Sequence, residues 1–120
     1  MQATNTKYAS GFTLVEIMIV VAIIGLLAAI AIPNFVKART TAQKNACINN
    51  LRQIDGAIEQ WALEQKKKQG DAVTTTGSPS VLDYLKGNVL PTCPADNSAY
   101  TITTVGTNPS CANAALGHTL

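Results

Sequence analysis

The chain has 120 residues and a formal net charge of +2; 47% of the residues are hydrophobic and only 13% are charged. Nine basic residues are nearly balanced by seven acidic ones. A nucleic-acid-binding surface needs clustered Lys and Arg and a much higher isoelectric point, so we predict no specific nucleic-acid partner.

The chain begins with a short polar segment and continues into a long apolar one. Met1–Ser10 shows no periodicity, holds one charge, Lys7, and is interpreted as a disposable leader. No charged residue occurs from Ile17 to Val36. As a helix, a run of that length covers about 30 Å, the thickness of the hydrocarbon layer of a bilayer. We therefore predict a helix that can span a membrane.

Glu16 stands at the edge of this apolar run. A carboxylate at the lip of a membrane helix is costly in lipid, so it suggests a functional site. The simpler alternative is an interfacial residue whose side chain reaches the headgroups.

The six residues Gly11-Phe12-Thr13-Leu14-Val15-Glu16 follow the polar leader and precede the membrane-length apolar run. In this arrangement they resemble the processing signature of type IV prepilins and of the pseudopilins of type II secretion. The resemblance continues through Gly25 and Pro33, where that family also tends to carry Gly and Pro. The resemblance is strong from Ser10 to about Ala38. Farther along the chain, only the presence of an amphipathic helix is similar.

The resemblance implies a series of processing and assembly steps. A membrane-embedded aspartic peptidase, the prepilin peptidase, would cut between Gly11 and Phe12, and Phe12 would be N-methylated. Glu16 would then pair with the terminal amine of Phe12 on a neighbouring subunit. Because an unpaired carboxylate in a packed apolar bundle is very unfavourable, this pair would set the axial register between subunits. The implied partners are further copies of the chain in a helical filament, the peptidase and inner-membrane assembly machinery.

Two other interpretations of the apolar run stay open. Ala29-Ile30-Ala31 is similar to a signal-peptide cleavage site, although the run is longer than such a signal needs and Glu16 stands where basic residues belong. The run could also be a plain single-pass anchor of an extracytoplasmic module. Charge counting favours a cytoplasmic location for the part after the run, because Lys7 precedes it whereas three cations follow it. The resemblance places that part outside the cytoplasm.

Gly25 and Pro33 weaken the predicted helix. A helical Gly costs about 1 kcal/mol relative to Ala. Pro removes a backbone donor and clashes with the carbonyl four residues earlier. The simplest interpretation is a bend in a membrane helix. The resemblance implies a segment that can lose helicity when the subunit packs into a filament.

Residues 37–69 are predicted to form an amphipathic helix. Five apolar residues at intervals of 4, 3, 4 and 3 lie on one stripe: Cys47, Leu51, Ile54, Ile58 and Trp61. Lysines at 66–68 suit the C-terminal end of a helix, and Gly70 is the expected stop. The rest of the chain must cover this stripe.

Residues 70–120 are predicted to form a small head, which gives an α+β fold. Ser78-Pro79 is expected to open a short helical turn that Gly87 ends. Tyr100–Val105 is rich in β-forming residues, and Val89-Leu90 is a candidate partner in a short antiparallel pairing. A head of about 50 residues rarely supplies enough core alone, so it needs a covalent staple or a packing partner.

Three cysteines offer such a staple. Cys93 and Cys111 flank the predicted strand, and a disulfide between them would contribute about 3 kcal/mol in the chain-entropy model. Cys47, on the apolar stripe, would then remain a buried thiol. Three single pairings are possible, so this one is inferred from position. We predict no metal site, since no cysteines are close in sequence and His118 is the only histidine.

The sequence suggests neither an enzyme nor a cofactor. It has one histidine, scattered carboxylates in the head and no Gly-rich phosphate loop. From the resemblance we expect a structural subunit of a type IV pilus-like filament. Its precursor would be stored in a bacterial inner membrane. A pseudopilin of a periplasmic type II secretion pseudopilus, or a minor or competence pilin, is the alternative from the same family.

The predicted organisation has four parts. Residues 1–11 form the leader, and residues 12–36 form the helix that spans the membrane and later the filament core. Residues 37–69 form the amphipathic helix, and residues 70–120 form the disulfide-stapled head.

Overall fold

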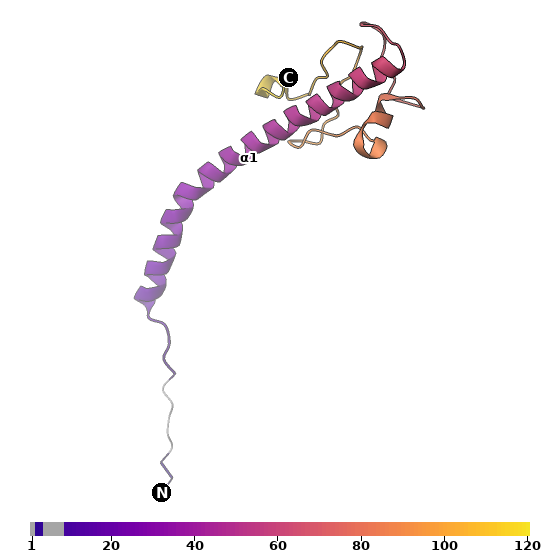
Figure 1. Cartoon of the computed structure of the whole chain (residues 1–120). Helices are drawn as coiled ribbons and strands as arrows, with labels where there is room; N and C mark the ends of the chain where they lie inside the picture. Colours follow the sequence, from indigo (N-terminus) through magenta and orange to yellow (C-terminus); the bar gives the residue numbers. More distant parts are fainter. Residues whose placement is uncertain (1, 4–8) are drawn as a thin grey trace. The chain divides into compact units, whose positions relative to one another are not determined.

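The computed structural model describes residues 2–3 and 9–120. Most of the predicted leader, residues 1 and 4–8, therefore lies outside the described residues. The described residues form one long helix, α1 (Leu14–Glu64; Figure 1), followed by three short 3-10 helices. These are η1 (Val81–Tyr84), η2 (Lys86–Asn88) and η3 (Ala114–Leu116). The chain divides into two compact units, Met1–Lys37 and Ala38–Leu120, and α1 contributes to both.

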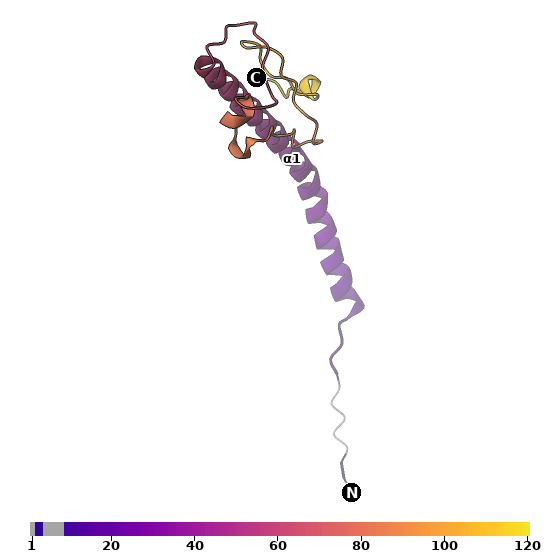
Figure 2. The ribbon, with the colours of Figure 1, turned by 90° about the vertical axis from the view of Figure 1, so that its right-hand side faces the viewer.

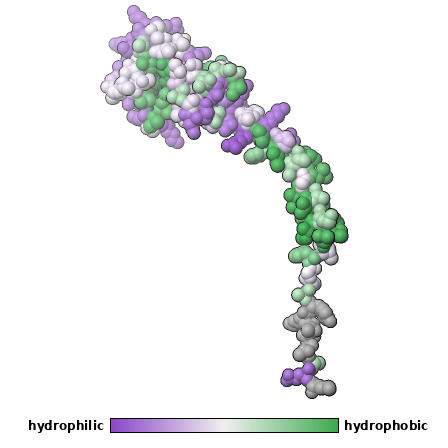
Figure 3. All heavy atoms as spheres, turned by 180° about the vertical axis from the view of Figure 1, so that it is seen from behind, coloured by the Kyte–Doolittle hydropathy of each residue, from purple (hydrophilic) through white to green (hydrophobic). Residues whose placement is uncertain are grey.

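The helical part of the first unit is apolar and exposed. α1 is the one helix among the described residues that is long and apolar enough to cross a membrane. Its large hydrophobic side chains between residues 14 and 36 are exposed, and Figure 3 shows them gathered on the visible face of this part of α1. The described residues leave this surface exposed, and an apolar surface of this size is expected to be covered by lipid or by other protein.

α1 is helical at both positions where the sequence predicts a weakness. Gly25 and Pro33 lie inside the helix, and Pro33 does not end it. The side-chain amide of Asn34 donates to the carbonyl of Ile30 (3.2 Å) in the turn that Pro33 interrupts. Loosening of this segment is therefore a proposal about an assembled form and not a feature of the single chain.

The second unit packs loops against one side of α1. Figure 2 shows the segments after α1 lying along its C-terminal part. All five residues of the predicted stripe are buried, which confirms the periodicity argument: Cys47, Leu51, Ile54, Ile58 and Trp61. The head contributes Val81, Leu85, Tyr100 and Val105 to the same core. The stripe therefore determines which face of α1 the head covers.

The predicted end of the amphipathic helix is wrong. α1 ends at Glu64 and does not continue to Gln69. The N–H of Lys66 bonds to the carbonyl of Leu63 (3.3 Å) and that of Lys67 to Ala62 (2.8 Å), while Lys66 is left-handed with φ 54°. These bonds form a Schellman-type end without the usual glycine. The ammonium of Lys67 then lies 5.8 Å from the centre of the Trp61 ring, an added contact that favours the early stop.

The predicted strands are absent from the part of the chain that the structure describes. The head instead has isolated antiparallel bridges, Ala72 with Thr104, Thr92 with Ala99, and Thr101 with Ser110. Each pairing stops after one residue pair because turns intervene, with left-handed backbone at Asn97 (φ 59°) and Gly106 (φ 85°). The head is thus built from loops and short 3-10 helices, and the α+β description is not confirmed.

The short helical turn is found, but it starts later than predicted. η1 begins at Val81, and the preceding Ser80, not Ser78, occupies the cap position. The carboxylate of Asp83 accepts a hydrogen bond from the N–H of Ser80 (2.9 Å). This bond satisfies a donor that the 3-10 turn leaves free. Gly87 is left-handed (φ 78°), but it lies within η2 and does not simply end the turn.

Candidate functional site

The first candidate site is the junction between the predicted leader and α1. Gly11 and Phe12 lie in non-helical chain directly before α1. Phe12 is 87% exposed, and nothing lies within 4 Å of the place where a side chain on Gly11 would stand. A protease cleft accepts an extended, accessible backbone, and the Gly11–Phe12 bond lies in accessible, non-helical chain.

Glu16 takes part in the cap at the start of α1. The N–H of Thr13 donates to the Glu16 carboxylate (3.0 Å), and the N–H of Glu16 donates to the hydroxyl of Thr13 (3.3 Å). This is a reciprocal capping box, with Thr13 as the N-cap and Glu16 as the third helical residue. The spacing Thr-x-x-Glu is itself a capping signal, and it could have been recognised from the sequence.

The capping box holds the Glu16 carboxylate beside the backbone of Thr13, the residue after Phe12. A negative charge here also faces the positive end of the helix dipole. Glu16 is thus oriented toward the N-terminal end of α1, where cleavage after Gly11 would create an amine. The structure does not test whether that amine on another copy binds Glu16.

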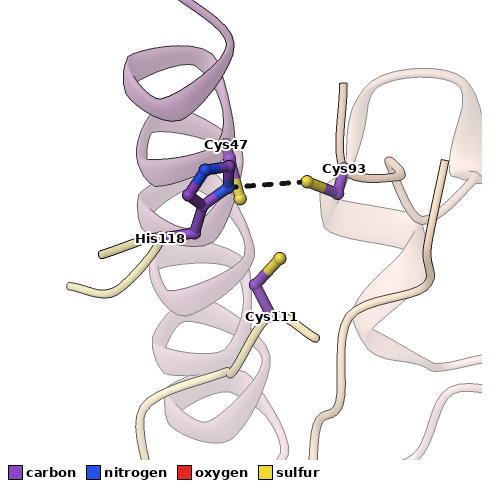
Figure 4. Close-up of side chains that lie close together, drawn as sticks. All are labelled: Cys47, Cys93, Cys111 and His118. Carbon is purple, nitrogen blue, oxygen red and sulfur yellow. Dashed lines mark hydrogen bonds between the residues drawn. The ribbon is translucent and has the colours of Figure 1, made fainter. Parts of the chain in front are cut away.

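A second candidate site lies in the core of the head. Cys47, Cys93, Cys111 and His118 are all buried, and their ligand atoms all lie within 4.8 Å of one another. The Sγ of Cys93 lies 3.7 Å from Nδ1 of His118. Figure 4 shows the three thiols and the imidazole converging on one small volume.

Each residue of this Cys/His cluster comes from a different segment. Cys47 lies on the buried stripe of α1, Cys93 follows η2, Cys111 precedes η3 and His118 follows η3. A tight turn sets the Cys93 backbone, because Asn97 N–H donates to the Cys93 carbonyl (2.7 Å). The cluster is therefore a meeting point of the helix with three loop segments.

Gly117 positions the histidine. It is left-handed (φ 82°) and ends η3, with its N–H bonded to the carbonyl of Ala114 (2.9 Å). A Cβ atom at this position would stand 2.7 Å from Nζ of Lys44, so any other residue would also have to displace the lysine side chain. His118 then turns into the core.

Polar groups surround the sulfurs. The hydroxyl of Tyr100 donates to Sγ of Cys47 (3.4 Å). Asn113 donates its N–H to Sγ of Cys111 (3.4 Å) and its side-chain amide to Sγ of Cys93 (3.5 Å). Each of the three sulfurs therefore accepts a hydrogen bond.

The cysteines differ in acidity. Burial raises the pKa of Cys47 to about 12, against a smaller lowering by the Tyr100 hydrogen bond. Burial also raises the pKa of Cys93, but hydrogen bonds from the Ala95 backbone, His118 and Asn113 outweigh it and lower that pKa to about 7. Of these two thiols, Cys93 therefore gives up its proton first.

Two of our expectations concern these residues directly. All three cysteines are free thiols in the structure, so the Cys93–Cys111 disulfide is not confirmed. We expected no metal site because the cysteines are far apart along the sequence, but the fold brings the three cysteines and His118 together in space. No sequence spacing reveals this, because the loops that carry three of the four have no regular secondary structure from which contacts follow. The cluster can form one disulfide or coordinate one metal ion.

Comparison with known proteins bears on the N-terminal site. The family model described as the prokaryotic N-terminal methylation motif matches residues 6–32. The type IV major pilin protein PilA of Myxococcus xanthus is 47% identical over 57 residues, covering 48% of this chain and 26% of the relative. The type II secretion system core protein G of Klebsiella pneumoniae is 30% identical over 93 residues, covering 72% of this chain and 66% of the relative.

A third relative, the type IV major fimbrial protein FimA of Dichelobacter nodosus, is 41% identical over 78 residues, covering 58% of this chain and 49% of the relative. The chain thus spans between about a quarter and two thirds of the length of these curated relatives. No solved structure matches the chain.

Proposed function

The chain belongs to the type IV pilin and pseudopilin family, and from this premise we propose that it is a structural, non-catalytic subunit of a pilus-like filament. The precursor is held in the inner membrane by the apolar part of α1. After processing by the prepilin peptidase, the assembly machinery packs the same helix into the filament core.

The observation that carries this proposal is that the apolar first half of α1 is exposed, whereas the stripe from Cys47 to Trp61 on its second half is already covered by the head. The exposed apolar surface of α1 is therefore covered by two environments in turn. Lipid covers it before assembly, and other α1 helices cover it afterwards. Contacts that repeat from one copy to the next without closing produce a filament of indefinite length.

We infer that processing occurs between Gly11 and Phe12. Accessible, non-helical chain at this bond supports the assignment, as does the methylation motif that spans it. Phe12 becomes the new N-terminus, carries the methyl group and stands four residues before Glu16. Gly25 and Pro33 are the proposed points at which α1 loosens when it leaves the membrane.

The mature chain is expected to begin at N-methylated Phe12. Intact mass spectrometry of filament-derived protein should give the mass of Phe12–Leu120 plus one methyl group, because the peptidase removes residues 1–11. A chain that starts at Ile32 would instead support a secretory signal peptide cut after Ala31. Retention of Met1 in assembled filaments would contradict processing altogether.

A pseudopilin of type II secretion is the second candidate. The core protein G relative matches 72% of this chain, whereas the PilA relative matches 48%. That longer match reaches into the head, whereas the higher identity to pilins covers a shorter stretch. Deleting the gene separates the two functions: loss of surface filaments identifies a pilin, and loss of protein export with intact filaments identifies a pseudopilin.

A monomeric membrane-anchored module is the candidate from another class. It requires the chain to remain in the membrane fraction as single copies. Sedimentation of sheared cell-surface material tests this directly, since a filament subunit pellets in large assemblies and an anchored monomer stays with the membrane.

A further inference from the structure

We propose that Cys47, Cys93, Cys111 and His118 bind one Zn²⁺ ion, which ties three loop segments of the head to α1. Four buried donor atoms from separate parts of the second unit already converge on one point. This proposal is independent of the filament function, because it concerns only how the head is held together.

The spacing of the donors fits zinc. Metal–sulfur bonds of about 2.3 Å and metal–nitrogen bonds of about 2.0–2.1 Å place the ligands of a tetrahedral site roughly 3.5–3.8 Å apart. The Cys93 sulfur and the His118 Nδ1 are 3.7 Å apart. All pairs among the four donors lie within 4.8 Å. Small rotations of the side chains about their Cα–Cβ bonds would bring the more distant donors to the tetrahedral spacing.

The number and type of donors indicate a structural site. Three thiolates and one imidazole complete the coordination of zinc, so no open position is left for a substrate. Cys47 and Cys93 are fully buried, and Cys111 and His118 are each 5% exposed. Soft sulfur ligands in tetrahedral array also disfavour calcium and magnesium, which take oxygen ligands.

The surroundings supply what thiolate ligands need. Tyr100 bonds to the sulfur of Cys47, and Asn113 bonds to the sulfurs of Cys93 and Cys111. Such outer hydrogen bonds orient metal ligands and stabilise their charge. A centre of Zn²⁺, three thiolates and a neutral imidazole has a net charge of −1. Lys44, which is positively charged, lines the same surface hollow as His118 and so lies near this centre. Three thiol protons leave as the ion binds.

The head has little regular secondary structure, so a bound ion would stabilise it. Apart from α1, the described part of this unit has only 3-10 helices of three or four residues and isolated bridges. A small unit of this kind needs a staple. A Cys93–Cys111 disulfide would join two loops to each other but would leave Cys47 and His118 as buried polar neighbours without a role. One zinc ion joins both loops, the C-terminal segment and α1.

The test begins with the full chain, purified in detergent, reduced and stripped of metal. We expect it to bind one Zn²⁺ per chain, and Co²⁺ in its place should give an intense thiolate-to-cobalt charge-transfer band and the visible spectrum of a tetrahedral centre. Zinc should also protect all three thiols from alkylation. A chain that gives the weak spectrum of six-coordinate Co²⁺, or whose thiols react equally with and without zinc, would overturn the proposal.

Single substitutions separate the zinc site from the disulfide. Cys47→Ala and His118→Ala should each abolish stoichiometric Co²⁺ binding, whereas Leu116→Ala, an exposed change in the hollow beside His118, should not. Asn113→Ala, which keeps all four ligands, should weaken zinc binding by about 10–100-fold.

The disulfide hypothesis predicts the opposite result. The oxidised chain would then be two mass units lighter, with a Cys93–Cys111 crosslink, and a chelator would leave the melting temperature of the wild-type chain unchanged. The zinc site instead predicts a fall in melting temperature for both variants and a fall of similar size when the wild-type chain is treated with a chelator. Because the wild-type spectrum needs no variant, a substitution that fails to fold leaves the proposal testable.

Discussion

Replacing Glu16 by alanine is expected to leave membrane insertion and cleavage after Gly11 intact and to abolish filaments. Insertion depends on the charge-free run that follows Glu16, and cleavage depends on the accessible Gly11–Phe12 bond. In the proposed filament, only assembly would bring the amine of Phe12 into a dry bundle of helices. Without a carboxylate partner that amine stays buried and unpaired, a loss of about 3–5 kcal/mol for each subunit added. Such a penalty at every step should block elongation.

The capping box complicates this experiment and also supplies its control. Glu16→Ala removes a helix cap as well as a charge, since Glu16 accepts from Thr13 N–H. Glu16→Gln keeps the shape and an acceptor for that bond, so it tests the charge alone. We expect it to restore less than half of wild-type assembly.

Thr13→Ala is the matched variant for the cap. It removes the hydroxyl that accepts from Glu16 N–H and keeps the carboxylate. The pairing role predicts near-normal filaments from Thr13→Ala, counted by electron microscopy of sheared material. Filament loss in Thr13→Ala equal to that in Glu16→Ala would show that the cap matters, and wild-type assembly of Glu16→Ala would make Glu16 an interfacial residue only.

Replacing Trp61 by alanine is expected to destabilise the head by about 3–5 kcal/mol, the range for removing a large buried aromatic side chain. Trp61 is 1% exposed and lies in the core between α1 and the head. Its indole N–H donates to the carbonyl of Pro79 (3.3 Å), and the ammonium of Lys67 lies over its ring. The substitution therefore removes packing, a hydrogen bond and a cation–π contact together.

Leu63→Ala is the control for this substitution. Leu63 lies two residues farther along α1 and is 78% exposed, so we expect a change in unfolding free energy within about 0.5 kcal/mol. The free energy of unfolding of both variants is measured by urea unfolding of the detergent-solubilised monomer. The readout is the resistance of the head to a protease at each urea concentration. A loss below about 1 kcal/mol for Trp61→Ala, well under the range for a buried aromatic side chain, would mean that the head does not depend on this face of α1.

Two parts of the fold were predicted correctly, one from length and one from periodicity. The charge-free run is long enough to span a membrane as a helix, and the stripe from Cys47 to Trp61 repeats at helical intervals, so the course of α1 and its buried face follow from the sequence. The predicted end of α1 was wrong because Lys66 takes a left-handed conformation that a glycine usually takes. The backbone bonds from Lys66 and Lys67 and the contact of Lys67 with the Trp61 ring accompany that conformation.

The head was harder to predict, for a physical reason. Tyr100–Val105 has β-forming residues, but a strand needs a partner of matching length, and the turns at Asn97 and Gly106 leave only single bridges among the described residues. The Cys/His cluster depends on where these loops pass. The Thr13–Glu16 cap, in contrast, was available in the sequence as Thr-x-x-Glu, a known capping pattern.

The most direct test of the proposed assembly is the structure of the filament itself by electron cryomicroscopy. We predict a core of α1 helices in which each chain begins at N-methylated Phe12. Its amine should lie within hydrogen-bonding distance of the Glu16 carboxylate of a neighbouring subunit. A filament in which Glu16 faces solvent, or in which subunits join through their heads while α1 lies outside the core, would contradict this assembly.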